Sequence, residues 1–284
     1  MSFVARRTED VEDWARAAEP LLAAAPDALH VLGTVLAGMR VEAAEARDPS
    51  APARLLAWVE DADGSPVAAA VRNPPHPFVV TNVPAGAAGA LASALREGFA
   101  GDAPLFAGPS DAARAVAEAW ARATGGRPAV VMGQTIHALS SVAPQPAQPS
   151  GAVRAAAEAD RPLLEEWMGG FGNEVGLPLG DPAAWVGQAL GDERIVVWDD
   201  GGPACLVRWS PVALGRVRIT AVYTPPERRG RGYAQATVAA MACRLLGEVA
   251  GLVIVTDDAN PTANGVYARV GYRPVSEAAV WTVR

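Results

Sequence analysis

A glycine-rich loop between an expected strand and an expected helix constrains this fold more than any other stretch. The strand is expected over residues 216–223 and an alanine-rich helix over about 233–249, with glycines at 230 and 232 between them. Glycines let successive backbone N–H groups point into one concavity, and the helix adds its unpaired N–H groups and the positive end of its dipole. The loop therefore predicts an anion site suited to a pyrophosphate, with nearby arginines adding positive charge.

Three known phosphate-binding patterns can be compared with this loop. The Walker pattern needs Lys-Ser/Thr at the start of the helix, where this chain has Ala234-Gln235, and the dinucleotide fingerprint needs three glycines where only two occur. The pattern that fits is Arg-x-x-Gly-x-Ala, at Arg229, Gly232 and Ala234. Preceded by a strand and a proline, it resembles motif A of the GNAT superfamily, the acyl-CoA-dependent N-acyltransferases.

A second motif follows in the order in which that superfamily has it. After an expected strand at 252–256 comes a helix expected over 261–270, with Asn260 as its N-cap and Gly271 at its end. Within it, Asn264 and Tyr267 are three residues apart and therefore share one helix face. This stretch resembles motif B, and the resemblance covers about residues 152–284.

The resemblance implies acetyl-CoA as cosubstrate and a site for each part of it. Backbone groups of Val222, Tyr223 and Thr224 would hold the pantetheine arm as an added strand would. The N–H groups of Arg229, Gly230, Arg231, Gly232, Tyr233 and Ala234 would bind the pyrophosphate, and Asn264 would hydrogen-bond the cofactor arm. Tyr267 would protonate the leaving thiolate.

Direct attack by a neutral primary amine on the thioester then needs no covalent enzyme intermediate, and a backbone N–H near Val222 would hold the oxyanion. Many family members carry a carboxylate on the strand before the loop, but residues 216–223 contain none. Glu174 is the candidate general base, although an ordinary solvated glutamate, a water relay or an amine that arrives deprotonated are alternatives. Cys205 and Cys243 are expected to be small core residues.

The two halves of the chain read as an internal duplication. Residues 54–58 match 194–198 at an offset of 140, and residues 125–128 match 271–274 at an offset of 146. A proline-rich, uncharged stretch divides the halves. The expected fold is α/β (α+β), with two tandem GNAT-like domains, each a mixed, mostly antiparallel sheet flanked by helices. The expected domains are 1–140 and 152–284, joined by a linker over 141–151.

The N-terminal half departs from the motifs. Its corresponding loop, after residues 78–84, keeps glycines but has no arginine. At the offset of 146, Glu118 replaces Asn264 and Ala121 replaces Tyr267. These differences predict a degenerate copy that binds no CoA.

Composition narrows the function further. The chain of 284 residues is half hydrophobic and has a net charge of −7, with two cysteines and three histidines. These values favour a folded cytoplasmic globular protein with no metal, no nucleic-acid partner and no membrane partner. The acceptor is expected to be a small-molecule or peptide amine, and the oligomeric state is left open. The alternative is a non-catalytic acyl-CoA sensor, although a sensor has no need of a proton donor such as Tyr267.

Overall fold

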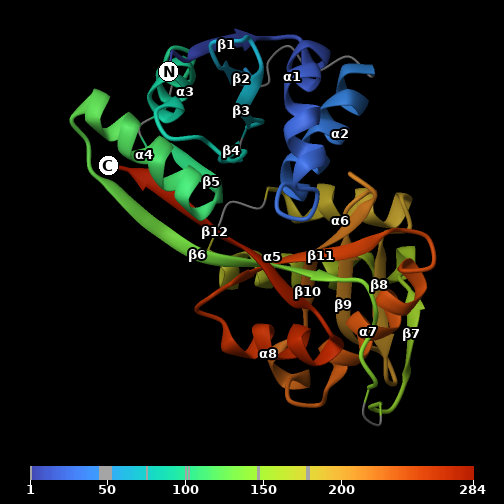
Figure 1. Cartoon of the computed structure of the whole chain (residues 1–284). Helices are drawn as coiled ribbons and strands as arrows, with labels where there is room; N and C mark the ends of the chain where they lie inside the picture. The colour runs from blue at the N-terminus through green and yellow to red at the C-terminus, as the bar shows by residue number, and fades with distance from the viewer. Residues whose placement is uncertain are drawn as a thin grey trace. The chain divides into compact units, whose positions relative to one another are not determined.

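The computed structural model describes residues 2–44, 53–74, 76–99, 101, 103–145, 148–176 and 180–284 (Figure 1). Its contacts divide the chain into two compact units. Unit 1 comprises Met1–Ile136, Asp257–Ala259 and Pro274–Arg284, and unit 2 comprises His137–Thr256 and Asn260–Arg273. The end of the chain therefore groups with the N-terminal half, because its last strand pairs with a strand of that half. The domain limits predicted from the duplication stay a prediction.

Unit 1 contains a mixed sheet. Its strands are β1 (Val4–Thr8), β2 (Leu55–Glu60), β3 (Pro66–Arg72), β4 (Phe78–Val80), β5 (Leu105–Pro109), most of β6 (Pro128–Leu139) and most of β12 (Arg273–Val283). They run in the order β1-β2-β3-β4-β5-β12-β6. Pairing is antiparallel from β1 to β4 and between β5 and β12, and parallel between β4 and β5.

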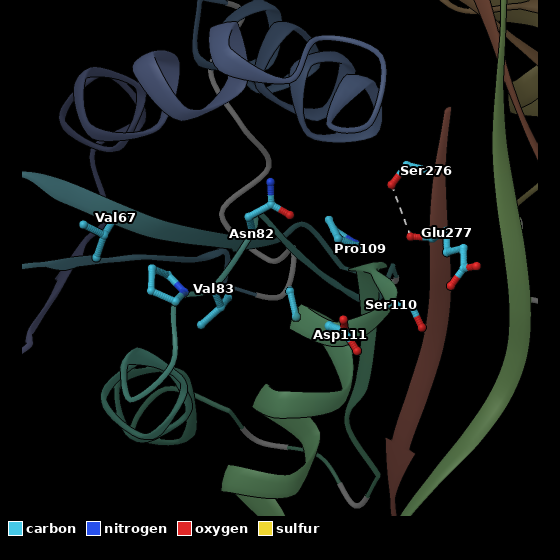
Figure 2. Close-up of a pocket in the computed structure, with 10 residues that line it drawn as sticks. Val67, Asn82, Val83, Pro109, Ser110, Asp111, Ser276 and Glu277 are labelled. Atoms are coloured by element: carbon cyan, nitrogen blue, oxygen red, sulfur yellow. Dashed lines mark hydrogen bonds between the residues drawn. The ribbon is translucent and has the colours of Figure 1, made fainter. Parts of the chain in front are cut away.

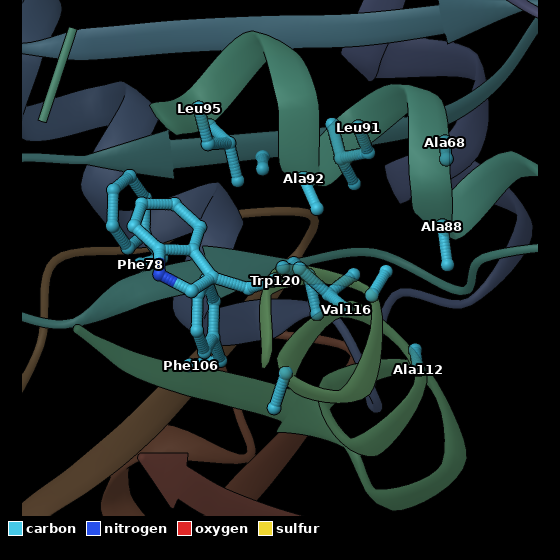
Figure 3. Packing of buried hydrophobic residues seen from close by; sticks show 14 of the residues in the cluster. Ala68, Phe78, Ala88, Leu91, Ala92, Leu95, Phe106, Ala112, Val116 and Trp120 are labelled. Atoms are coloured by element: carbon cyan, nitrogen blue, oxygen red, sulfur yellow. The ribbon is translucent and has the colours of Figure 1, made fainter. Parts of the chain in front are cut away.

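The helices of unit 1 are α1 (Val11–Ala24), α2 (His30–Ala44), α3 (Ala87–Arg96) and α4 (Ser110–Thr124). In the core, the Trp120 ring lies edge-on to Phe106 at 5.4 Å, and Phe78 stacks on Phe106 at the same distance (Figure 3). Small alanines on α3 and α4 let these helices approach the sheet closely. The helix α4 ends at Gly125, whose left-handed conformation (φ +74°) closes its last turn.

The strands of unit 2 belong to the same hydrogen-bonded sheet and have helices on both faces. Its strands are β7 (Ala152–Ala155), β8 (Ile195–Asp199), β9 (Pro203–Trp209), β10 (Arg216–Tyr223) and most of β11 (Gly251–Asp257). Its helices are α5 (Arg161–Val175), α6 (Pro182–Gly191), α7 (Tyr233–Leu245) and α8 (Pro261–Val270). The strand order is β11-β10-β9-β8-β7, and only β10 and β11 pair in parallel. Apolar residues of α5 and α6 pack on one face of the sheet, and those of α7 and α8 pack on the other.

Most elements of unit 2 lie where the sequence places them. The hairpin turn at Asp199–Gly202 is confirmed, and so are the Asn260 cap and the Gly271 stop of α8, which has φ +116° at that glycine. The strands β1 and β7 were not predicted, because their exposed, charged residues give no buried alternation. The helix α7 ends at Leu245 rather than near 249.

One core prediction is wrong. Cys205 is buried as expected, but Cys243 is exposed. It lies on the outer side of α7, between Ala242, which is buried, and Arg244, which is exposed. In a helix so rich in alanine, hydrophobicity alone does not mark which face is buried. Within the described residues, none of the helices is long and apolar enough to span a membrane.

Candidate active site

The candidate site begins where two neighbouring strands of unit 2 stop pairing. The parallel ladder between β10 and β11 runs from Arg216–Gly251 to Ile219–Ile254 and ends there. On its other side, β10 stays paired with β9 as far as Tyr223. A bulge between Ile219 and Ala221 changes the register of β10 at the same point. The last residues of β10 therefore present backbone groups to a gap in the ladder rather than to β11.

The loop after β10 leads into α7 through two glycines in the left-handed region. Gly230 has φ +77° and Gly232 has φ +83°, which a residue with a Cβ adopts only at a cost. A Cβ built on Gly232 would meet nothing within 4 Å, so the space in front of α7 is open. The N–H of Arg229 already donates to the carbonyl of Pro226 (3.3 Å). The backbone N–H groups that remain to bind an anion are those of residues 230–234.

Arg229 is held in place by three interactions. Its Nε donates to the carbonyl of Thr224 (2.8 Å), its Nη2 forms an ion pair with Glu174 (2.6 Å), and its guanidinium lies 5.7 Å from the centre of the Tyr223 ring. Burial raises the pKa of Tyr223, and the Glu174 carboxylate adds to that shift. Glu174 thus joins the C-terminal end of α5 to the loop, and the structure brings it to Arg229.

Tyr233 fixes the first turn of α7 to the β8–β9 hairpin. Its hydroxyl donates to Asp200, which also accepts from Ser150 (2.9 Å). These two donors, Tyr233 first, lower the pKa of Asp200. The Tyr233 hydroxyl is therefore used in a structural hydrogen bond, and the part of Tyr233 that can contribute to the loop is its backbone N–H.

Tyr267 lies in the core between α8 and the sheet, 7% exposed. Its ring meets Tyr272 edge-on at 5.8 Å. Burial, and to a smaller extent the thiol of Cys205, raise its pKa, so the phenol is protonated at neutral pH. Asn264 lies one turn earlier on α8, and its Oδ1 is buried. Both motif B residues thus lie on the part of α8 that faces the protein.

Cys205 is the other reactive group near this place, and its environment makes it a poor nucleophile. It is fully buried in β9, its Sγ donates to the carbonyl of Leu206 (3.5 Å), and burial raises its pKa to about 11. Since the thiolate is the nucleophilic form, almost none of it forms at neutral pH.

Comparison with known proteins shows which fold the chain has. The family model described as FR47-like protein matches residues 204–282. A GCN5-related N-acetyltransferase from Sphaerobacter thermophilus is similar over 99% of this chain and 95% of its own, with 18% identity and a TM-score of 0.60. A tandem GNAT protein from the clavulanic acid biosynthesis pathway is similar over 99% and 97%, with 15% identity and a TM-score of 0.55. The chain has a tandem GNAT fold.

A Drosophila protein is also similar over nearly the whole length of both chains, 99% of this chain and 98% of its own, with 13% identity and a TM-score of 0.66. No curated protein matches the chain. The resemblance to the GNAT superfamily and the predicted fold class are confirmed, and the tandem GNAT fold extends over both halves.

Unit 1 has a similar glycine turn before its helix α3, but a side chain fills the space beside that turn. Gly86 precedes α3 in the left-handed region (φ +89°), but a Cβ there would lie 3.2 Å from the Phe3 ring. Unit 1 also has a cavity of about 420 Å³, between the ends of β4 and β5 and beside β12 (Figure 2). Its polar lining residues include Asn82, Asp111 and Glu277, and no arginine or lysine lines it. This lining does not suit a pyrophosphate.

Sequence reasoning missed a group of residues on the α5/α6 face of the unit 2 sheet. Arg208 of β9 is 7% exposed, and its guanidinium stacks 4.2 Å from the centre of the Trp185 ring of α6. Trp185 also lines a cleft of about 270 Å³ between α5 and α6. The available signal was an arginine inside the apolar run 203–209, a place where an unpaired charge is costly.

Proposed function

We propose that the chain is an acetyl-CoA-dependent N-acetyltransferase whose active site lies in unit 2. It transfers the acetyl group to a primary amine by direct attack in a ternary complex. The observation that carries the proposal is the end of the β10–β11 ladder at Ile219–Ile254, next to the open loop before α7. The similarity to a GCN5-related N-acetyltransferase and to a tandem GNAT protein supports acyl transfer as the reaction class.

The residues present fit a CoA molecule. Within the described residues the N–H groups of 230–234 have no acceptor, and together with the N-terminus of α7 they suit a pyrophosphate. The side chain of Arg231 is exposed in the same loop, and that of Arg228 is half-buried. The backbone of Val222 to Thr224 borders the gap in the ladder and suits the amides of a pantetheine arm. When bound, acetyl-CoA would supply an activated thioester.

Tyr267 is the group we assign to proton donation. Its raised pKa keeps the phenol protonated, so that it holds a proton for the departing thiolate as the C–S bond breaks close to it. The same shift weakens Tyr267 as an acid, so proton transfer has to coincide with breakage of the C–S bond. Asn264, one turn away, would orient the arm that brings the sulfur to Tyr267. The inert Cys205 is consistent with transfer that uses no acyl-enzyme.

Glu174 fits a positioning role better than the role of general base. Its carboxylate is paired with Arg229, and that pair joins α5 to the loop. Unit 1 has neither the arginines nor the open space before its helix, so we propose one active site per chain.

Two measurements test the proposed function. Calorimetry should show that acetyl-CoA binds, and an amine panel should show release of the free thiol that depends on the amine. Binding without thiol release from any amine would instead favour the acyl-CoA sensor, and the absence of binding would overturn both readings.

A further inference from the structure

Three arginines gather on or beside the α5/α6 face of the unit 2 sheet, and the proposed transfer mechanism uses none of them. We call Arg194, Arg208 and Arg218 the arginine cluster. Val217 and Ile219 pack on the α7/α8 side, so alternation along β10 places Arg218 on the opposite side. Arg208 lies on that side as well, because it contacts α6. Arg194 directly precedes β8, whose first residue, Ile195, pairs with Arg208.

Arg208 is held rigidly by uncharged groups. Its Nη1 donates to Thr220 Oγ1 (3.2 Å), its Nη2 donates to Gln188 Oε1 (3.3 Å), and its plane lies over the Trp185 ring. Its Nε is buried with no hydrogen-bond partner. Stacking on tryptophan orients a guanidinium without neutralising it. Arg208 therefore keeps its full charge and one unused donor.

Arg218 has less support than Arg208. In the described part of the chain its guanidinium makes no hydrogen bond and no ion pair, and its Nε is buried. Among the described residues, the only ion pair in the cluster joins Arg194 to Asp192, and the Nε of Arg194 is also buried with no partner there. Burial lowers the pKa of both Arg208 and Arg218 to about 10, and for Arg208 the charges of Arg194 and Arg218 add to that effect. Three cations thus share one carboxylate.

Such an arrangement costs stability unless something compensates for it. Buried charges are ordinarily paired, and like charges close together repel one another. Apolar residues would cover this face of the sheet without that cost. The three buried Nε–H donors and the excess positive charge match an anion bound in the fork geometry that guanidinium groups favour.

The cluster is also close to the proposed site of transfer. Thr220, which holds Arg208, lies in the bulge of β10, two residues before Val222. At about 3.3 Å per residue, the separation along the strand is about 7 Å. Trp185, on which Arg208 stacks, lines the cleft between α5 and α6. A small molecule could therefore place an anionic group on the cluster and a second group near Val222.

We propose that the arginine cluster binds the anionic group of the acceptor, so that the substrate is a small primary amine bearing a carboxylate or a phosphate. This inference rests on the proposed acetyltransferase function of unit 2. It names the substrate class of that same site.

Matched pairs of acceptors test the proposal. Phosphoethanolamine is compared with ethanolamine, and β-alanine with its amide, in each case with saturating acetyl-CoA. We expect the anionic member of at least one pair to have a kcat/KM at least tenfold higher than its neutral partner, and the pair that responds identifies phosphate or carboxylate. Arg218→Met should reduce that ratio to within about threefold, whereas Arg244→Met, which removes an exposed arginine of α7, should leave it unchanged. Equal use of both members, or a preference that survives Arg218→Met, overturns the proposal while the acetyltransferase function stands.

A binding experiment keeps the proposal testable if no amine in the panel is acetylated. Inorganic phosphate is titrated by calorimetry into wild type, Arg218→Met and Arg244→Met, with saturating CoA present so that the pyrophosphate site is occupied. We expect Arg218→Met to weaken phosphate binding at least tenfold and Arg244→Met to leave it unchanged, because Arg244 is an exposed arginine of α7 outside the cluster. Phosphate binding that is absent, or that does not depend on Arg218, overturns the proposal. Failure of CoA itself to bind would count against the proposed function instead.

Discussion

Gly86 and Gly232 occupy the same place in the two halves of the molecule. Each precedes a helix in a left-handed conformation, with φ +89° and +83°. In unit 1 the Phe3 ring packs against this place, whereas in unit 2 the space is open. The connection in unit 1, residues 81–86, is also shorter than the connection in unit 2, residues 224–232, and carries no arginine. The backbone turn is therefore common to both halves, and the ability to bind an anion depends on what lies around it.

The helices that follow show the same contrast. Both α4 and α8 end at a left-handed glycine, Gly125 and Gly271. Counting back from these glycines, Ala121 corresponds to Tyr267, and both are buried. Packing thus retains an apolar group at this position in both copies, while only unit 2 has a hydroxyl there. The comparison separates what the fold needs from what the proposed chemistry needs, and each prediction below tests one part of it.

The largest expected effect comes from removing the hydroxyl of Tyr267. Tyr267→Phe keeps the ring and removes the proton donor, so kcat should fall about 10²-fold or more while the affinity for acetyl-CoA stays within a few-fold. Pre-steady-state measurement of thiol release checks the step directly. Tyr272→Phe is a matched control, because Tyr272 is a buried tyrosine in contact with Tyr267. Its hydroxyl has no partner within the described residues, so removing it should leave kcat unchanged and should not lower stability. Wild-type release rates in Tyr267→Phe would show that this residue only packs.

A tenfold effect is expected from blocking the loop of unit 2. Gly232→Glu puts a side chain and a negative charge into the open space before α7, so calorimetry should show acetyl-CoA binding weakened at least ~10-fold, or about 1.4 kcal/mol. Gly86→Ala in unit 1 is the comparison, because it strains a backbone of nearly the same φ. It should reduce thermal stability, since its Cβ meets the Phe3 ring, and leave the affinity unchanged. Unchanged affinity in a folded Gly232→Glu variant would contradict the assignment of the pyrophosphate site.

A smaller effect is expected at Glu174. Glu174 and Arg229 are about half exposed, and an ion pair of that kind contributes about 0.2–1 kcal/mol. Glu174→Gln should therefore raise KM for acetyl-CoA by up to about fivefold and leave kcat and the shape of its pH profile unchanged. Loss of a general base would instead lower kcat by 10²-fold or more and remove the acidic limb of the profile. The size of the change thus decides between positioning and base catalysis.

The sequence predicted the parts of the site that depend on local geometry. The left-handed glycines before α7, the cap of α8 and the hairpin at residues 199–202 follow from backbone conformation, which a few adjacent residues determine. The arginine cluster could not be predicted, because Arg208 and Arg218 meet only when β9 pairs with β10 and a bulge sets the register. The pairing of β12 with β5 also depends on residues far apart in sequence. The pairing of Glu174 with Arg229 depends on the path of α5 in the same way.

The smallest expected effect, a factor of two in stoichiometry, tests the comparison itself. Titration of the whole chain with CoA should show one site per chain, because unit 1 lacks the arginines and its left-handed glycine is covered by Phe3. Phe3→Ala removes the cover but supplies no positive charge, and Asp111 and Glu277 still line the nearby cavity. If the missing positive charge is what prevents unit 1 from binding CoA, the stoichiometry of this variant stays at one. If the Phe3 ring alone prevents unit 1 from binding CoA, a second, weaker binding event appears in Phe3→Ala. Adding Gly232→Glu to the same chain would leave that event in place. A value of two in the wild type would show that the loop arginines are not needed to hold CoA, which would also remove their role in unit 2.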